Sequence, residues 1–348
     1  MRAMTAVPGQ RGTAGVGEVP DPTVADGGLL VRGRLVGVCG TDREIAEGEY
    51  GEPPPGDTKL IIGHEGLGEV LEAPAGSGFD PGDLVVGIVR RPDPVPCPAC
   101  AAGEWDMCRN DQFVERGIVR RHGYGSEQWR LEPEFALKIP AELGELGVLL
   151  EPASVLAKAW EQVDRISQRA FFLRGTALVT GAGPIGLLAC LLGMQRGYEV
   201  HVVDLATGGP KRDLVEALGA HYHAGDVIDV DADVEVVIEC TGLGAVGRSA
   251  AQRVVSGGIM CLTGIMNLEP QLDTDATALN RNMVLHNNVL FGTVNAGRRH
   301  WEQAVDALTA GDREWLSGMI TRRVPLARWT DALDRRAEDI KVVVDLTA

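Results

Sequence analysis

Hydrophobic residues follow two different patterns along the chain, and the change falls near Glu151. Before Ile139, short β-branched runs at residues 29–31, 68–71 and 84–89 alternate with stretches rich in glycine and proline. Because these runs are short and no long helical period accompanies them, they predict an irregular domain built mostly from β-strands.

Beyond Glu151 helical and strand-like segments alternate. A helical stretch at residues 157–168 comes before an apolar run at 176–180, a glycine-rich turn and a second apolar run at 185–192. This alternation predicts an α/β domain with a doubly wound parallel sheet. Further predicted elements are a helix at 210–218 and strands at 199–204, 234–240, 259–262 and 289–294.

The last segment predicts a helix at 300–308, an amphipathic helix at 326–336 and an apolar run at 342–346. We expect the final run to return to the first domain, which makes that domain discontinuous. A chain of 348 residues also exceeds the length over which one hydrophobic core usually grows. The expected domains are a mostly β domain of residues 1–155 and 296–348, and an α/β domain of residues 156–295.

The chain is acidic, with a net charge of −16 and a pI near 4.9. A surface of this sign repels nucleic-acid phosphates and anionic lipids, so neither is expected as a partner. The N-terminus lacks the pattern of a secretory signal, and no apolar run approaches the length of a bilayer span. We therefore expect a cytoplasmic protein with a small-molecule partner.

Three of the seven cysteines crowd into one short segment, at Cys97, Cys100 and Cys108. In a reducing compartment such crowding favours metal ligation over disulfides. The isolated cysteines of the α/β domain lie in apolar stretches, where a free thiol behaves as a small hydrophobic side chain. They are Cys190, Cys240 and Cys261.

The glycine-rich turn has the spacing Gly181, Gly183 and Gly186 between a predicted strand and a predicted helix. In this Rossmann-type context the glycines permit a tight turn, close approach to a pyrophosphate and close packing of helix on strand. Asp204 ends the next strand, where a carboxylate binds ribose hydroxyls and repels a 2′-phosphate, so NAD is favoured over NADP. The expected cofactor-binding residues are Gly181, Gly183, Pro184, Ile185, Gly186, Asp204, Lys211, Arg212 and Thr241.

Lys211 and Arg212 leave NADP open, because they follow Gly208 and Gly209 closely and their charges suit a phosphate. The alternative is that they form the solvated first turn of a helix.

A second constellation consists of Cys39, His64 and Glu65, to which Glu151 is added. A thiolate, an imidazole and carboxylates are the ligands that zinc accepts, and a catalytic zinc keeps one position open. A lone cysteine or histidine is more often a packed residue than a ligand, so the combination with a dinucleotide domain carries the inference.

These residues stand in motifs that resemble the zinc-containing medium-chain dehydrogenases over nearly the whole chain, and in particular the glucose dehydrogenase branch. The resemblance implies a GroES-like catalytic domain beside the Rossmann-type domain. The motifs are VCGTDRE at 38–44, GHE at 63–65, VRRP at 89–92, ERGI at 115–118, LEP at 150–152, LHN at 285–287 and GTVN at 292–295.

The resemblance implies that Cys39 and His64 bind a catalytic zinc, with Glu65 and Glu151 as ligands or near neighbours that exchange with its water. Thr41 is expected to bind the substrate hydroxyl and begin a proton relay, the alternative being a helix N-cap. Ordinary alcohol dehydrogenases of the superfamily have a cysteine in the Glu151 region. The carboxylate favours the polyol and sugar branches.

Cys97, Cys100 and Cys108 match the last three ligands of the family's structural zinc. Pro94 stands where the first cysteine is expected, and it has no ligating atom. Asp93 is expected to supply an oxygen as the fourth ligand. The alternative is a loop that binds no zinc.

On the substrate side, Glu115 resembles the sugar-binding glutamate of glucose dehydrogenases. The alternative for Glu115 is an exposed loop residue. Asn295 resembles the asparagine that lies near the substrate and the nicotinamide in this family. For His122 and His286 a surface or cross-strand role is expected.

The expected reaction is zinc-dependent hydride transfer from C1 of an aldose, glucose first, to NAD(P), which yields the lactone. Alternatives are a cyclitol, polyol or secondary-alcohol dehydrogenase and, in another class, a redox-inactive dinucleotide-binding sensor. The resemblance also implies a homodimer or homotetramer, for which the strand at 289–294 is the candidate edge strand.

Overall fold

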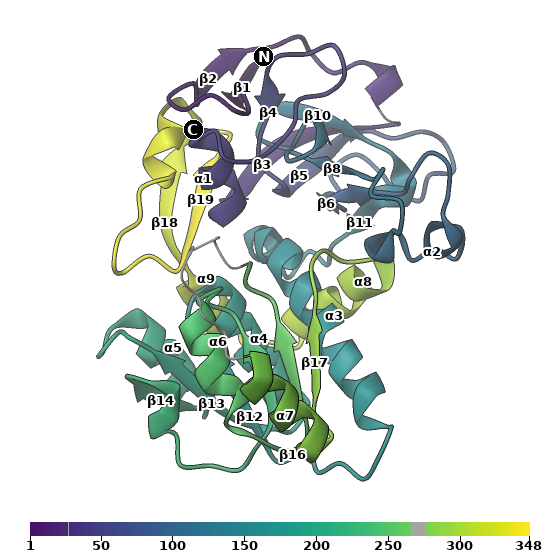
Figure 1. Cartoon of the computed structure of the whole chain (residues 1–348). Coiled ribbons are helices and arrows are strands. Elements are labelled where there is room, and N and C mark those ends of the chain that lie inside the picture. Colours follow the sequence, from purple (N-terminus) through teal and green to yellow (C-terminus); the bar gives the residue numbers. More distant parts are fainter. Residues whose placement is uncertain (27, 266–275) are drawn as a thin grey trace. The chain divides into compact units, whose positions relative to one another are not determined.

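The computed structural model describes residues 1–26, 28–265 and 276–348, and the chain divides into two compact units. The first unit contains residues 1–154 and 295–348, and the second contains residues 155–294. The sequence places each boundary one residue later. Both chain termini belong to the first unit (Figure 1).

The first unit is built on a seven-stranded sheet whose strands follow the order β11-β6-β5-β3-β19-β18, with β10 also paired to β3. Its centre is β3, which pairs antiparallel with β5 on one side and with β19 on the other. The strands are β3 (Leu29–Val38), β5 (Glu65–Glu72), β6 (Leu84–Gly87), β10 (Gln128–Leu131), β11 (Ala136–Lys138), β18 (Ile320–Pro325) and β19 (Lys341–Asp345).

Two small sheets complete the β structure described in the first unit. One has the order β2-β1-β4, from β1 (Arg2–Ala6), β2 (Gly15–Glu18) and β4 (Leu60–Ile61). The other has the order β7-β8-β9, from β7 (Arg90–Arg91), β8 (Val114–Arg116) and β9 (Arg120–Arg121). The unit's helices are α1 (Gly40–Ala46), α2 (Pro98–Ala101), α8 (Arg298–Thr309) and α9 (Arg313–Met319), and α3 (Leu150–Ser167) begins here and continues into the second unit.

The second unit contains a six-stranded parallel sheet with the order β14-β13-β12-β15-β16-β17. Numbered along the chain within this sheet, the order is third, second, first, fourth, fifth, sixth, which is the doubly wound arrangement. The predicted α/β class is therefore confirmed. The strands are β12 (Thr176–Thr180), β13 (Glu199–Asp204), β14 (His221–Ala224), β15 (Val234–Glu239), β16 (Val254–Leu262) and β17 (Val289–Gly292).

Helices follow the strands of this sheet: α4 (Pro184–Gln195), α5 (Pro210–Ala217), α6 (Gly244–Ala251) and α7 (Ala276–His286) (Figure 1). Part of the core is a cluster of buried aliphatic residues from β12, β13, β15, β16 and α6. Its fully buried members include Leu178, Val234, Val237 and Ala250. Burying these side chains removes apolar surface from water, which is the main favourable term in folding.

The predicted amphipathic helix at 326–336 is wrong. The structure has a short 3₁₀ segment at Leu326–Ala332, with Arg328 outside helical geometry at φ −129° and ψ 31°. Leu326, Trp329 and Ala332 are its buried residues. A spacing of three suits a 3₁₀ turn, in which side chains three apart lie directly above one another.

The sequence pattern does not predict several elements whose apolar pattern is weak. Among them are β14, β18, α6, α7 and α9. The edge strand β14, with sequence His-Tyr-His-Ala, has no fully buried residue. None of the described helices is long and apolar enough to cross a membrane.

Candidate active site

Cys39 lies at the junction between β3 and α1, as the N-cap residue of α1. Its Sγ accepts a hydrogen bond from Thr41 N over 3.3 Å, and its own N–H donates to Asp42 Oδ2 over 2.9 Å. The N-cap role left open for Thr41 therefore belongs to Cys39. The first turn of α1 therefore fixes the position of the Cys39 thiol at the N-terminus of this helix.

His64 and Glu65, at the start of β5, meet Cys39 in a compact group. The Cys39 Sγ and His64 Nε2 atoms are 3.2 Å apart, and one ligand atom from each of the three residues lies within 4.8 Å of the others. Ligand atoms about 2.0–2.3 Å from a shared zinc ion must lie at such separations from one another. The donor set and its spacing therefore fit zinc.

Asp42 supports His64 from behind. Its Oδ1 lies 3.5 Å from His64 Nδ1, and Asp42 is completely buried. A carboxylate on the second nitrogen of a ligating imidazole fixes the ring's tautomer and orientation. This residue belongs to the quoted motif at 38–44, but its role was not predicted.

The charges of this group are strongly coupled. Burial alone would lower the pKa of His64, but Cys39 and Asp42 raise it well above its ordinary value. Burial opposes ionisation of Asp42, yet His64 and the N–H of Cys39 bring its pKa below the ordinary value. The site therefore favours a cation between the thiol and the carboxylates.

Glu65 also forms an ion pair with Lys341, the first residue of β19, and both side chains are almost fully buried. The two side chains meet over Gly37 of β3, which pairs with Glu65. A Cβ added at Gly37 would lie 1.9 Å from Glu65 Oε2 and 2.8 Å from Lys341 Cε. A glycine is therefore required at this point of the central strand. Lys341 was missed by the sequence analysis, although a lysine beside an apolar run is a usable signal.

Glu151 lies in the first turn of α3, outside the compact group of Cys39, His64 and Glu65. Burial raises the pKa of the Glu151 carboxyl to about 7. The neighbouring Glu65 raises this pKa further, whereas His64 lowers it. Glu151 is therefore close enough to interact electrostatically with His64 and Glu65.

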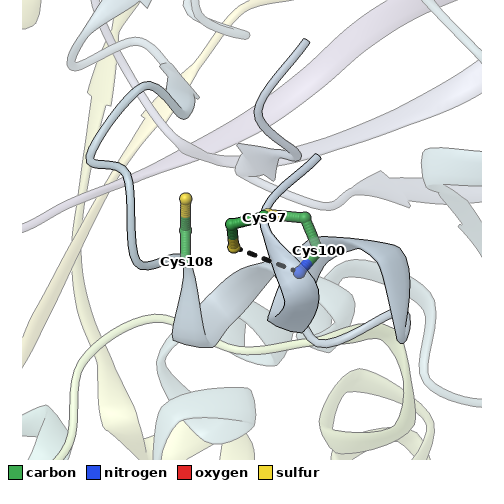
Figure 2. Close-up of side chains that lie close together, drawn as sticks. All are labelled: Cys97, Cys100 and Cys108. Carbon is green, nitrogen blue, oxygen red and sulfur yellow. Dashed lines mark hydrogen bonds between the residues drawn. The ribbon is translucent and has the colours of Figure 1, made fainter. Parts of the chain in front are cut away.

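Cys97, Cys100 and Cys108 form a second group, with the three sulfur atoms within 4.8 Å of one another (Figure 2). Backbone N–H groups of Cys100 and Arg109 each donate to Cys97 Sγ over 3.4 Å and lower the pKa of Cys97 to about 7. Burial raises the pKa of Cys100 to about 11. Three converging sulfurs, one stabilised as a thiolate, fit a structural zinc.

Asp93 is buried near this group but engages other partners. Its Oδ1 accepts from Val95 N over 2.8 Å, and its Oδ2 accepts from Asn110 Nδ2 over 2.7 Å. The described group of three cysteines does not include it. Its role as fourth ligand stays a prediction.

Glu115 and Asn295, both predicted to bind substrate, contact each other directly. Asn295 Nδ2 donates to Glu115 Oε1 over 2.6 Å. The same carboxylate is held by Arg90, at 3.0 Å from Nε and 2.9 Å from Nη2. Glu115 is buried, so it is not an exposed loop residue. Arg90, whose role was missed, lies 3.7 Å over the ring of Phe113.

In the second unit, the glycine-rich turn joins β12 to α4 as predicted. Gly181 has φ +84°, and a Cβ at Gly186 would lie 1.7 Å from Gly181 O. Gly183 is the N-cap of α4 and Pro184 begins that helix. The first N–H groups of a helix provide a site for a phosphate.

Asp204 ends β13 beside this turn. Its Oδ2 accepts from Ala182 N over 2.7 Å, and its Oδ1 accepts from Ala206 N over 2.9 Å. Although burial opposes it, these N–H groups and Lys211 hold the pKa of Asp204 below its ordinary value. Lys211 Nζ is 3.5 Å from Asp204 Oδ2, whereas Arg212 pairs with Glu216 on the surface.

Thr241 follows β15 and is anchored by Glu239, a fully buried carboxylate that the sequence analysis missed. Glu239 Oε1 accepts from Thr241 N over 2.7 Å and from Thr180 Oγ1 over 3.1 Å. This network fixes the ends of β12 and β15 next to the glycine-rich turn. A single glutamate at the end of an apolar strand was the available signal.

The remaining predicted histidines take surface roles. His122 Nε2 pairs with Asp57 over 3.1 Å, and His286 Nδ1 lies 2.8 Å from Ser256 Oγ. Neither pair involves the two cysteine-containing groups.

Comparisons with known proteins cover the whole chain. A family model described as glucose dehydrogenase C-terminus matches residues 144–346, and one described as alcohol dehydrogenase GroES-like domain matches residues 25–141. Glucose 1-dehydrogenase of Methanocella arvoryzae is 38% identical, with 100% of each chain covered. Glucose 1-dehydrogenase of Thermoproteus tenax is 37% identical, with 99% of each chain covered.

A solved structure of Haloferax mediterranei glucose dehydrogenase in complex with NADP, zinc and gluconolactone matches with a TM-score of 0.91. It is 31% identical and covers 100% of both chains. The predicted combination of a GroES-like domain with a Rossmann-type domain is confirmed. The chain belongs to the zinc-containing medium-chain alcohol dehydrogenase superfamily, in its glucose dehydrogenase branch.

Proposed function

We propose that this chain is a zinc-dependent glucose 1-dehydrogenase, which transfers a hydride from C1 of D-glucose to NAD(P)⁺ and yields gluconolactone and a proton. The observation that carries the proposal is the compact group of Cys39, His64 and Glu65. Full-length similarity to glucose 1-dehydrogenases supports glucose as the substrate. A related structure in complex with NADP, zinc and gluconolactone supports the cofactors and product.

In this proposal Cys39 Sγ and His64 Nε2 bind the zinc, and Glu65 and Glu151 are ligands or exchange with its water. Bound zinc would lower the pKa of the C1 hydroxyl, and bound NAD(P)⁺ would accept the hydride. Asp42 keeps the His64 ring in place, and Lys341 balances the charge of Glu65. Thr41, on the first turn of α1, accepts the hydroxyl proton and passes it on.

Glu115 and Asn295 bind the sugar's other hydroxyl groups in this proposal. Arg90 holds the Glu115 carboxylate, and Asn295 donates to the same oxygen. A site built from such held polar groups discriminates against analogues that lack the matching hydroxyls, because its buried groups would lose their partners.

We assign a structural zinc to Cys97, Cys100 and Cys108. The convergence of the three sulfurs supports this assignment, and Asp93 is the proposed fourth ligand. None of the seven cysteines forms a disulfide, which supports the proposed location in a reducing cytoplasm.

The dinucleotide binds at the turn from Gly181 to Gly186, with Thr241 nearby, and NAD is the proposed preference. Asp204 supports NAD because its low pKa keeps it charged beside the turn. Lys211 makes the preference for NAD weaker, because its Nζ lies 3.5 Å from the Asp204 carboxylate and its positive charge suits the 2′-phosphate of NADP.

A substrate panel tests the proposed reaction. We expect D-glucose to reduce NAD(P)⁺ with a higher kcat/KM than inositols, open-chain polyols or simple alcohols, because Glu115 and Asn295 are proposed to pair with the other hydroxyl groups of the sugar. Formation of NAD(P)H is followed by absorbance. A clear preference for inositol would favour a cyclitol dehydrogenase. If no compound led to reduction of NAD(P)⁺, the proposed dehydrogenase activity would be refuted.

Asp42→Asn tests the support of His64. We expect zinc affinity to fall about 10- to 100-fold, since losing the carboxylate behind a ligating imidazole has effects of this size. Activity should return when zinc is added, and the circular dichroism spectrum should be unchanged. Asp57→Asn removes a similar carboxylate from the surface residue His122 and should leave zinc affinity unchanged. Equal zinc affinities in the two variants would contradict the assignment.

Asp204→Asn tests the cofactor preference. We expect the ratio of kcat/KM for NAD to that for NADP to fall about tenfold or more, because a hydrogen bond to a charged group is lost for NAD while repulsion of the 2′-phosphate is relieved. Asp213→Asn, in the first turn of α5, is the matched control. An unchanged ratio in Asp204→Asn would rule out the ribose assignment.

We propose a homodimer or homotetramer in which the edge strand β17 lies at the interface. Val284 and Leu285 of α7 support this proposal, because they are apolar and 66% and 60% exposed. Light scattering should give a mass of two or four times the 37.0 kDa of one chain. Leu285→Glu should lower this mass, whereas Ile228→Glu, at another exposed apolar residue, should not. A monomeric wild-type chain would contradict the proposal.

A further inference from the structure

Three of the seven histidines gather at one edge of the parallel sheet, in the second unit, whereas both cysteine-containing groups belong to the first unit. His201 belongs to β13, and His221 and His223 belong to the edge strand β14 (Figure 1). The register pairs His201 with His221 and Val203 with His223. Because alternate residues of a strand point to the same face, these imidazoles project from one face of the sheet together with Glu199.

The side chains converge to distances typical of metal ligands. Glu199 Oε1 lies 3.0 Å from His221 Nε2 and 3.7 Å from His201 Nε2. One ligand atom from each of these three residues lies within 4.8 Å of the others. Two imidazoles and a carboxylate form a donor set that zinc accepts.

His223 provides the support that a ligating histidine usually has. Its Nε2 lies 2.8 Å from His201 Nδ1, so one hydrogen bond joins the two rings. When His201 Nδ1 donates this bond, the lone pair of His201 Nε2 faces Glu199 and His221. That Nε2 atom is buried without a hydrogen-bond partner. A metal ion would satisfy it, and the hydrogen bond behind it fixes the required tautomer.

The cluster is separate from the proposed dinucleotide site. Glu199 begins β13 and Asp204 ends it, so five residue steps of extended chain separate their positions by roughly 16 Å. The dinucleotide turn lies at the Asp204 end, so neither cofactor binding nor hydride transfer explains the histidines.

We propose that Glu199, His201 and His221 bind a further zinc ion, with His223 as the residue that orients His201. Water completes the coordination, because the side chains of His221 and Glu199 are 53% and 60% exposed. The ion would join the edge strand β14 to β13, and its role would be structural. The proposal does not depend on the reaction catalysed in the first unit.

Zinc binding by the full-length protein tests the proposal. Wild-type protein and variants are dialysed against the same free Zn²⁺ concentration, and zinc per chain is measured by mass spectrometry. We expect His221→Ala to retain one zinc fewer than wild type. His286→Ala removes a surface histidine of the same unit and should retain the wild-type number. Glucose oxidation should be unchanged in both variants.

Two further variants refine the test. Glu199→Gln, at an exposed position, should weaken the same zinc, and His223→Ala should lower its affinity about tenfold or more through loss of support for His201. Equal zinc content in wild type, His221→Ala and Glu199→Gln would overturn the proposal. Loss of zinc from His286→Ala as well would overturn it too, because the loss would then not depend on the cluster.

Discussion

The buried ion pair between Glu65 and Lys341 is the interaction on which the first unit's site depends. A carboxylate and an ammonium ion lose much of their hydration on burial, so each requires the other. They come from β5 and β19, far apart in the sequence, and meet over Gly37 on the strand between them. The pairing of Gly37 with Glu65 brings His64, just before β5, close to Cys39, just after β3, and the need of Glu65 for Lys341 explains why the last strand returns to the first unit.

Each unit supplies one half of the proposed chemistry from its own residues. The first unit concentrates a thiol, an imidazole and several carboxylates around one point, where a divalent cation would offset their charge. The second unit offers the N-terminus of α4 and the carboxylate of Asp204 to a dinucleotide. In each unit a buried acidic residue fixes the position of a residue of the proposed site. Asp42 contacts His64 in the first unit, and Glu239 accepts a hydrogen bond from Thr241 N in the second.

Local patterns were sufficient to predict the parallel sheet and its turn, because apolar runs and glycine spacing there reflect nearby contacts. The metal-binding groups required the resemblance to a family, since Cys39 and His64 are separated by 24 residues in the sequence and no local rule brings them together. Lys341 and Arg90 were missed because their roles arise from long-range pairing. The edge strand β14 was missed because histidines and a tyrosine replace the usual aliphatic residues.

The central claim is that Cys39 and His64 hold the zinc ion on which the activity depends. Anomalous X-ray diffraction at the zinc absorption edge, from crystals of active protein, tests it most directly. The account predicts a zinc peak about 2.3 Å from Cys39 Sγ and about 2.0–2.1 Å from His64 Nε2. Fully active protein whose crystals show no zinc between these two atoms would contradict it.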